Sequence, residues 1–170
     1  MLADRADADL TTTLHDGPEA LYALLSSRLG RHPGFGLLTV LAPNRSGDML
    51  IRLFSSNTGQ YPLGDADPVQ DDRWFRRLFV ERRPVVANDP LEIGNWLPDY
   101  TEFVEMGYAS LLNMPVVIAG ESIGVMNVMG GPGHFSQAAV SAIAAETPLA
   151  ALAILGRGDG FRRLELPAGR

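Results

Sequence analysis

The sequence predicts an α+β fold in which helices cover both faces of a central antiparallel sheet. Three observations support this: apolar residues at helical spacing near both ends, two pairs of short apolar runs joined by turns, and a globular composition with 46% hydrophobic and 20% charged residues. The 170 residues suit one domain. We place it at residues 13–156, between a disordered N-terminal tail (1–12) and a flexible C-terminal tail (157–170).

The first elements are a helix and a hairpin. Residues 18–29 repeat apolar side chains on one helical face and begin after an Asp-Gly pair, which is typical of a helix start. The runs 35–41 and 49–54 are apolar or alternating, and the turn-rich residues 43–48 separate them. This order predicts a helix followed by two antiparallel strands.

The middle of the chain predicts a second helix, a short strand and a long loop. Residues 71–82 place aromatic side chains at helical spacing behind two aspartates, and Pro84 ends the helix. A brief strand at 85–87 leads into a loop that contains Trp96. The capping-box spacing of Asp99 and Glu102 then predicts a short helix that ends near Gly107.

The last elements are a second hairpin and a helix. The apolar runs 110–118 and 122–129 flank a turn at 119–121, and Ser136 is a cap for a helix that reaches about Leu155. Pro148 removes a backbone donor and should kink or restart that helix.

The C-terminal helix, residues 137–155, is unusually apolar. Its only charge is Glu146, and residues 148–155 are apolar on every side. Such a helix is normally buried. We therefore expect a homodimer through this helix, or alternatively an intramolecular pair with the helix at 18–29. The fully apolar stretch is too short for a membrane span.

Composition excludes several chemistries. The chain has no cysteine, and all 14 of its Lys+Arg residues are arginine, so thiolate, disulfide and lysine chemistry are absent. The three histidines, His15, His32 and His134, have unrelated spacings and match no metal or triad motif. We expect no enzyme and no cofactor, with histidine or carboxylate catalysis as a remote alternative.

Charge also restricts the partners. A net charge of −6 argues against nucleic acid and against anionic membranes, and the first ten residues contain no signal-like apolar run, which favours a cytoplasmic location. Residues 84–156 contain acids but no arginine, whereas arginines concentrate between positions 45 and 83. The arginines either form a solvated, ion-paired face or flank an anion site.

Three segments in the second half carry a family resemblance: Gly107-Tyr108-Ala109-Ser110-Leu111-Leu112-Asn113-Met114-Pro115-Val116, Gly120-Glu121-Ser122-Ile123-Gly124-Val125-Met126-Asn127-Val128, and Phe135-Ser136 before an alanine-rich helix. They resemble the GAF domain family, and the layout agrees over residues 18–156. The resemblance implies a profilin-like, PAS-related fold. It also implies a sensory or regulatory domain that binds a small metabolite non-covalently and signals through a partner protein.

The alternative is a ligand-free dimerisation or scaffold module.

The chain differs from three known groups of the family, and these differences restrict which ligand a sensory domain of this kind could bind. Free methionine sulfoxide reductases and covalent bilin binders of this fold need cysteine, and the signature of cyclic-nucleotide binders contains a lysine, so this chain matches none of them.

The resemblance implies that Leu111, Asn113, Asn127 and Met129 face a ligand cavity. Buried amides need partners, which are either the protein itself, water or a polar ligand group. A hairpin connection of three residues would place both asparagines on one face, and a connection of two would separate them.

The opposite wall would come from aromatic residues, which could equally be core: Trp74, Phe75, Trp96, Tyr100 and Tyr108. Asp89 could bind a ligand or cap an Asp-Pro turn. For an anionic group the candidates are Arg52 and the pair Arg76 and Arg77.

Overall fold

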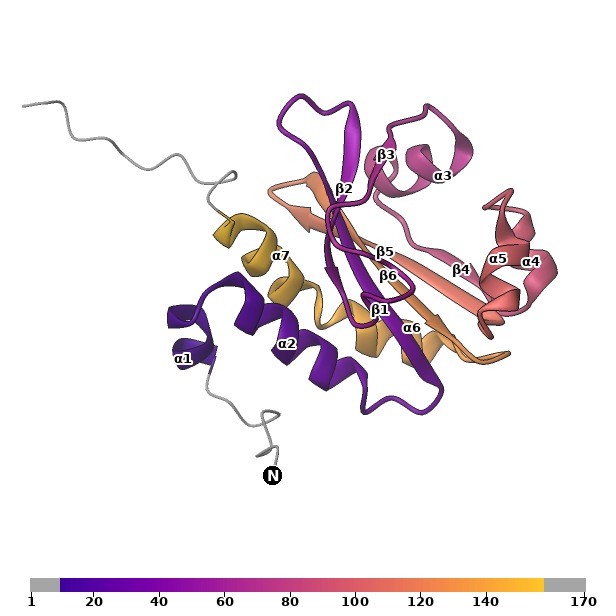
Figure 1. Ribbon diagram of the computed structural model, residues 1–170, viewed down its shortest axis with the longest axis horizontal. Helices are drawn as coiled ribbons and strands as arrows, with labels where there is room; N and C mark the ends of the chain where they lie inside the picture. Colours follow the sequence, from indigo (N-terminus) through magenta and orange to yellow (C-terminus); the bar gives the residue numbers. More distant parts are fainter. Residues whose placement is uncertain (1–9, 158–170) are drawn as a thin grey trace, which may run out of the picture.

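The computed structural model describes residues 10–157 and shows an antiparallel sheet between two helical layers (Figure 1). Its six strands lie in the order β3-β2-β1-β6-β5-β4. They are β1 (Phe35–Pro43), β2 (Met49–Ser55), β3 (Ala66–Pro68), β4 (Val85–Ala87), β5 (Ser110–Ile118) and β6 (Glu121–Gly130). The α+β prediction is confirmed.

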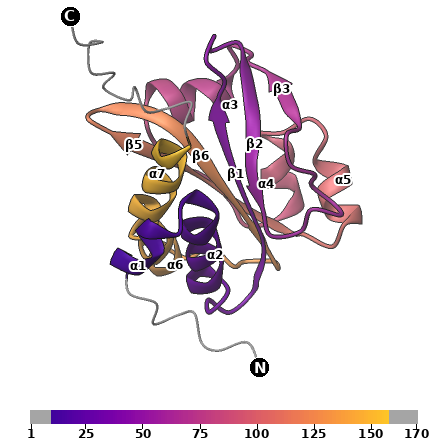
Figure 2. The ribbon, with the colours of Figure 1, turned by 60° about the vertical axis from the view of Figure 1, so that its left-hand side comes forward.

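One face of the sheet is covered by helices from the two ends of the described chain. They are α1 (Leu10–His15), α2 (Pro18–Leu29), α6 (Gln137–Ala144) and α7 (Thr147–Gly156). Figure 2 shows α2 and α7 side by side against the sheet. The main core lies here and contains Leu25 and Ala150, both fully buried. Residues 10–12 belong to α1, so the predicted tail does not extend that far, and residues 1–9 and 158–170 lie outside the described part.

The last helix is broken where the sequence predicted. Ser136 caps α6 by accepting a hydrogen bond from the Ala139 N–H, and Pro148 sits in the first turn of α7. Five residues of α7 are buried inside the chain, against α2, β5 and β6. This is the intramolecular pairing that was the alternative to a homodimer. The stretch Gln137–Gly156 is long and apolar enough to cross a membrane by length and composition, a test that core helices of soluble proteins also pass.

The other face carries a layer of short helices, which we call the cover. It consists of α3 (Arg73–Phe75), the π-helix η2 (Arg76–Val80), α4 (Pro90–Gly94) and α5 (Tyr100–Glu105). The predicted helix at 71–82 is therefore shorter and changes its winding after one turn. Asp72 caps it by accepting from the Phe75 N–H, and Arg82 takes a positive φ of 57° just before Pro84.

Two parts of the cover differ from the prediction. The long loop around Trp96 contains a helix, α4, whose cap is Asp89: its Oδ1 accepts from the Glu92 N–H at 2.9 Å. The capping box predicted at Asp99 does not form, because the Asp99 side chain makes no cap hydrogen bond at the start of α5. The three-residue edge strand β3 is exposed along its length and was not predicted.

Candidate functional site

A row of polar side chains crosses the sheet on the face that the cover protects. Asn113 lies directly opposite Asn127, Asn127 opposite Thr39, and Thr39 opposite Ser55, so the row spans β5, β6, β1 and β2 in register. We call these four residues the polar row. Asn113, Thr39 and Ser55 are buried, whereas Asn127 is only half-buried.

Hydrogen bonds link the row to the cover. The indole Nε1 of Trp74 donates to Asn113 Oδ1 at 2.8 Å, Asn113 Nδ2 donates to Asn127 Oδ1 at 2.7 Å, and Asn127 Nδ2 donates to Thr39 Oγ1 at 3.2 Å. An indole N–H can only donate, so it fixes the orientation of both carboxamides in turn. Each of the two asparagines therefore forms hydrogen bonds with side chains of the protein itself, one of the three kinds of partner expected from the sequence.

Two β-bulges give these side chains their direction. The hairpin between β5 and β6 turns through only Ala119 and Gly120, which on its own would place the asparagines on opposite faces. One extra residue, Ile123, shifts the register between Val116 and Val117 and returns Asn127 to the face of Asn113.

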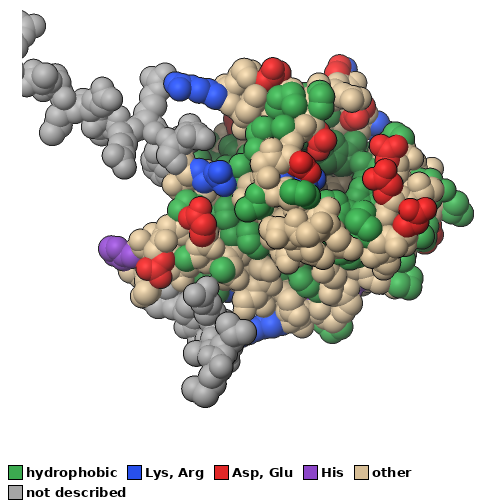
Figure 3. Space-filling model, viewed as in Figure 1, with side chains coloured by type: hydrophobic (Ala, Val, Ile, Leu, Met, Phe, Trp, Pro, Cys, Tyr) green, Lys and Arg blue, Asp and Glu red, His purple; other side chains and the backbone are tan. Residues whose placement is uncertain are grey.

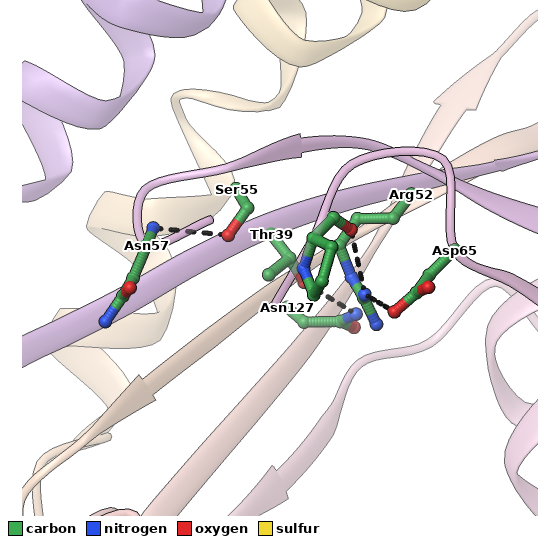
Figure 4. A network of polar contacts seen from close by, with 7 residues as sticks. Thr39, Arg52, Ser55, Asn57, Asp65 and Asn127 are labelled. Carbon is green, nitrogen blue, oxygen red and sulfur yellow. Dashed lines mark hydrogen bonds and ion pairs between the residues drawn. The ribbon is translucent and has the colours of Figure 1, made fainter. Parts of the chain in front are cut away.

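A second bulge acts on β2. The partner of Val40 is Phe54, but the partner of Leu41 is Arg52, so Leu53 is the extra residue. As a result Arg52 points to the same side of the sheet as Thr39 and Asn127, as Figure 4 shows.

A cavity of about 680 Å³ lies between the polar row and the cover. The row separates two apolar clusters on this face: one contains Leu37, Leu111 and Met129, and the other contains Leu41 and Val125. Aromatic side chains from the cover and from the β2–β3 connection complete the walls: Trp74, Phe75, Trp96, Phe103 and Tyr61. The Tyr61 and Phe103 rings are parallel within 6°, with centroids 6.5 Å apart, and burial raises the pKa of Tyr61 to about 12.

Arg52 is the one cationic side chain among the described residues that line the cavity. Its Nη1 donates to Asp65 Oδ2 at 2.7 Å and to the Pro62 carbonyl at 3.1 Å, and its guanidinium lies 5.2 Å from the Tyr61 ring centroid. The side chain is 12% exposed. Its Nε is buried and has no hydrogen-bond partner among the described residues, an arrangement that costs about 1–3 kcal/mol for an ordinary polar group.

Carboxylates surround the opening of this cavity. We call them the rim carboxylates: Asp65, Asp67, Asp72, Asp99 and Glu102. All five residues are exposed. In Figure 3 acidic side chains stand around a hollow on this side of the molecule. The lining is therefore basic at one point of the floor and acidic at the opening.

The structure brings together eight of the residues proposed from sequence. Those that line the cavity are Arg52, Trp74, Phe75, Trp96, Leu111, Asn113, Asn127 and Met129.

Asp89, Tyr100 and Tyr108 lie outside the lining. Asp89 is instead the N-cap of α4, and the Tyr100 ring packs on Gly94. Tyr108 packs on Gly36 and donates its hydroxyl to Gln60 Oε1 at 2.9 Å.

The other arginines proposed for an anion site are paired elsewhere. Arg76 pairs with Asp71, and Arg77 pairs with Glu81 at 3.1 Å and donates to the Pro84 carbonyl. For these two arginines the structure therefore agrees with the ion-paired alternative and not with an anion site. Sequence reasoning missed Tyr61, Phe103 and the rim carboxylates. These residues lie on loops, on β3 and on α5, and they reach the cavity only through the tertiary fold.

Within residues 10–157, no three His, Asp or Glu side chains are placed to hold a metal ion. His134 lies at the far end of β6 against Gly34 and Gly130, and burial together with the nearby His32 lowers its pKa.

Comparisons with known proteins agree with this architecture. The family model described as "GAF domain" matches residues 17–155. Similar solved structures include a GAF domain/HD domain protein from Geobacter sulfurreducens (17% identity, 84% of this chain and 94% of that chain, TM-score 0.67) and a methyl-accepting chemotaxis protein, residues 122 to 287 (18%, 89% and 97%, TM-score 0.64).

A type II free methionine-R-sulfoxide reductase from Thermoplasma acidophilum also shares the fold (13% identity, 83% of this chain and 94% of that chain, TM-score 0.60). No curated protein matches the chain in sequence. At these identities the structural likeness establishes the fold alone. The family model, which spans most of the sequence, establishes more: the chain belongs to the GAF domain family, whose members are generally sensory or regulatory.

Proposed function

We propose that this GAF domain binds a small metabolite non-covalently in the cavity between its sheet and its cover, and that binding is passed to a partner protein. The cavity volume of about 680 Å³ falls within the range of about 300–1,000 Å³ that is usual for small-molecule sites. Apolar and aromatic walls with a few polar groups are also usual there.

The polar row is the observation that carries the proposal. A sheet face that served only as core would be apolar throughout, but here polar side chains occupy the centre of the face between two apolar clusters. Asn127 is half-buried on the cavity side, and the Arg52 Nε lacks a partner. These groups can bind a ligand without any change in the strands that hold them.

Transmission to a partner would start at Trp74. Its indole is bonded to the polar row, and it stands on α3 beside η2, which contacts β5 and β6. A ligand on the row would therefore contact the cover directly. The cover elements are short, so small shifts in them are inexpensive compared with shifts in the sheet.

The test is a thermal-shift screen against common metabolites with two matched variants at the end of α5. Met106→Trp adds bulk to a residue of the cavity lining at the C-cap of α5, whereas Val104→Trp changes an exposed residue of that helix. A ligand at about 100 times its Kd should stabilise the wild type and Val104→Trp by about 2.7 kcal/mol. It should stabilise Met106→Trp far less. The proposal fails if no compound shifts the wild type, or if Met106→Trp responds equally.

A ligand-free dimerisation module is the second candidate, and the surface of the last two helices favours it. Only 28% of the most apolar window of Gln137–Gly156 is buried. The exposed residues form an uncharged stripe: Ala138, Ser141, Ala145, Pro148 and Leu152.

This second candidate predicts a dimer by light scattering at tens of micromolar. Leu152→Asp should convert it to a monomer, while Leu91→Asp, at an exposed site on α4, should not. A monomeric wild type would rule it out.

A further inference from the structure

The floor of the cavity presents hydrogen-bond donors. After the bonds within the polar row are made, Asn127 Nδ2 retains a second N–H and Thr39 retains its hydroxyl proton. Both carboxamide oxygens already accept one bond each. Arg52 adds a buried Nε–H that has no acceptor among the described residues.

Arg52 on β2 and Asn127 on β6 both line the cavity, on the two strands that flank β1. The two side chains, with Thr39 between their strands, point to the same side of the sheet (Figure 4). The link from Arg52 to Asp65 uses Nη1 and so leaves Nε for another partner. Donors of this kind, one of them cationic, bind a carboxylate better than any neutral acceptor.

The opening of the cavity has the opposite charge. Five rim carboxylates face a single guanidinium on the lining, and Asp67, Asp99 and Glu102 form no ion pair with other described residues. Arg73 stacks on the Trp96 ring at 4.0 Å and does not line the cavity. The opening therefore repels polyanions and favours a positive group.

Apart from the polar row and the rim carboxylates, the cavity has largely apolar walls. Trp74, Phe75 and Trp96 line the cavity from the side of the cover, and Leu111 and Met129 line it from the sheet, beside the polar row. Such walls suit an aliphatic or aromatic body.

From this order of donors, apolar walls and carboxylates we infer that the ligand is a small zwitterion with its carboxylate at one end, its ammonium at the other, and an apolar body between them. The carboxylate binds Arg52 and Asn127, and the ammonium lies among Asp99, Glu102 and Asp67. Apolar dipeptides and ω-amino acids have this layout. The inference rests on the proposed function, because it names the class of ligand for the same cavity.

The experiment measures the Kd values of a defined panel by calorimetry on the full chain. The panel holds dipeptides of Leu, Met, Phe and Trp and medium-length ω-amino acids, each with its N-acetyl and its C-terminal amide derivative. Free purine and pyrimidine bases, dicarboxylates and primary amines complete it. We expect at least one zwitterion to bind. Removal of its carboxylate charge should weaken binding about tenfold or more, and removal of its ammonium charge by a few-fold, because the carboxylates at the opening are exposed.

Variants assign the two ends. Arg52→Gln should weaken the parent zwitterion by about tenfold to a hundredfold and leave its amide derivative unchanged. The double change Asp99→Asn with Glu102→Gln should weaken the parent by only a few-fold, since these residues are exposed, and should not affect the N-acetyl form. Arg45→Gln, on an exposed turn, is the matched control.

Because the derivatives are compared on the wild type, the test remains decisive if Arg52→Gln does not fold. The inference is overturned if the N-acetyl and amide forms bind as tightly as their parents. It is also overturned if bases, dicarboxylates or amines bind in a way that Met106→Trp blocks while no zwitterion does; the proposed function would then stand. If nothing in the panel binds, the inference fails, and the metabolite screen above decides the proposed function.

Discussion

Replacement of Asn113 by Leu tests the polar row most directly. Asn113 is 2% exposed and accepts from Trp74 while it donates to Asn127. Asn113→Leu keeps the branched shape and the number of side-chain heavy atoms but leaves the Trp74 N–H and the Asn127 oxygen without partners. Each such loss costs about 1–3 kcal/mol, and the lower half of that range applies because both partners are half-buried. We expect a destabilisation of about 2–4 kcal/mol.

The assay is urea unfolding, read as a change in midpoint at constant m. The decisive comparison is the double variant Asn113→Leu with Asn127→Leu. If the two carboxamides act as a bonded pair, the double variant removes both partners, so its cost should be at least 1 kcal/mol smaller than the sum of the single costs. Costs that add within about 0.5 kcal/mol would refute the reasoning.

Three further predictions concern packing, a cap and a histidine. Gly124→Ala would place its Cβ 2.6 Å from the Leu41 carbonyl oxygen and should cost about 1–3 kcal/mol in urea unfolding, whereas Gly131→Ala meets no atom within 4 Å and should change stability by less than about 0.5 kcal/mol. Ser136→Ala removes the cap of α6 and should lower the unfolding free energy by about 1 kcal/mol; no loss would mean that the 3.2 Å bond is unimportant. The lowered pKa of His134 means that the unfolded state binds a proton more readily, so stability should fall as pH drops through the ordinary histidine value of about 6.5 and level off below the folded-state pKa. His134→Gln should flatten that slope in unfolding curves at pH 5–8, and the exposed His15→Gln should not.

The sequence was sufficient where structure depends on local chemistry. The helix at 18–29 and the strands at 85–87 and 110–118 have the predicted bounds, because apolar period, caps and turn residues decide them. The GAF resemblance also directed attention to Leu111, Asn113, Asn127 and Met129, all of which line the cavity.

What the sequence could not supply depends on contacts between distant segments. Nothing local marks Tyr61 as a partner of Phe103, or Asp72 and Glu102 as neighbours of one opening. Asp99 was predicted as a helix cap and Asp89 only as a ligand contact or turn residue, yet it is Asp89 that makes a capping bond. The two β-bulges could not be predicted either, because Leu53 and Ile123 are apolar residues within apolar runs and no local feature distinguishes them.

Those two extra residues give the domain an economical way to vary what its cavity offers. If Ile123 joined a continuous ladder, so that β6 had no bulge, Met126 would lie opposite Asn113; Met126 and Val128 would then face the cover and Asn127 would face α7. If β2 had no bulge, Leu53 would lie opposite Leu41 and Arg52 would turn to the opposite face of the sheet. Which side chains face a ligand therefore depends on where the strands bulge as well as on residue identity. The gain or loss of a bulge, rather than a substitution, would be the largest step by which such a site changes its specificity.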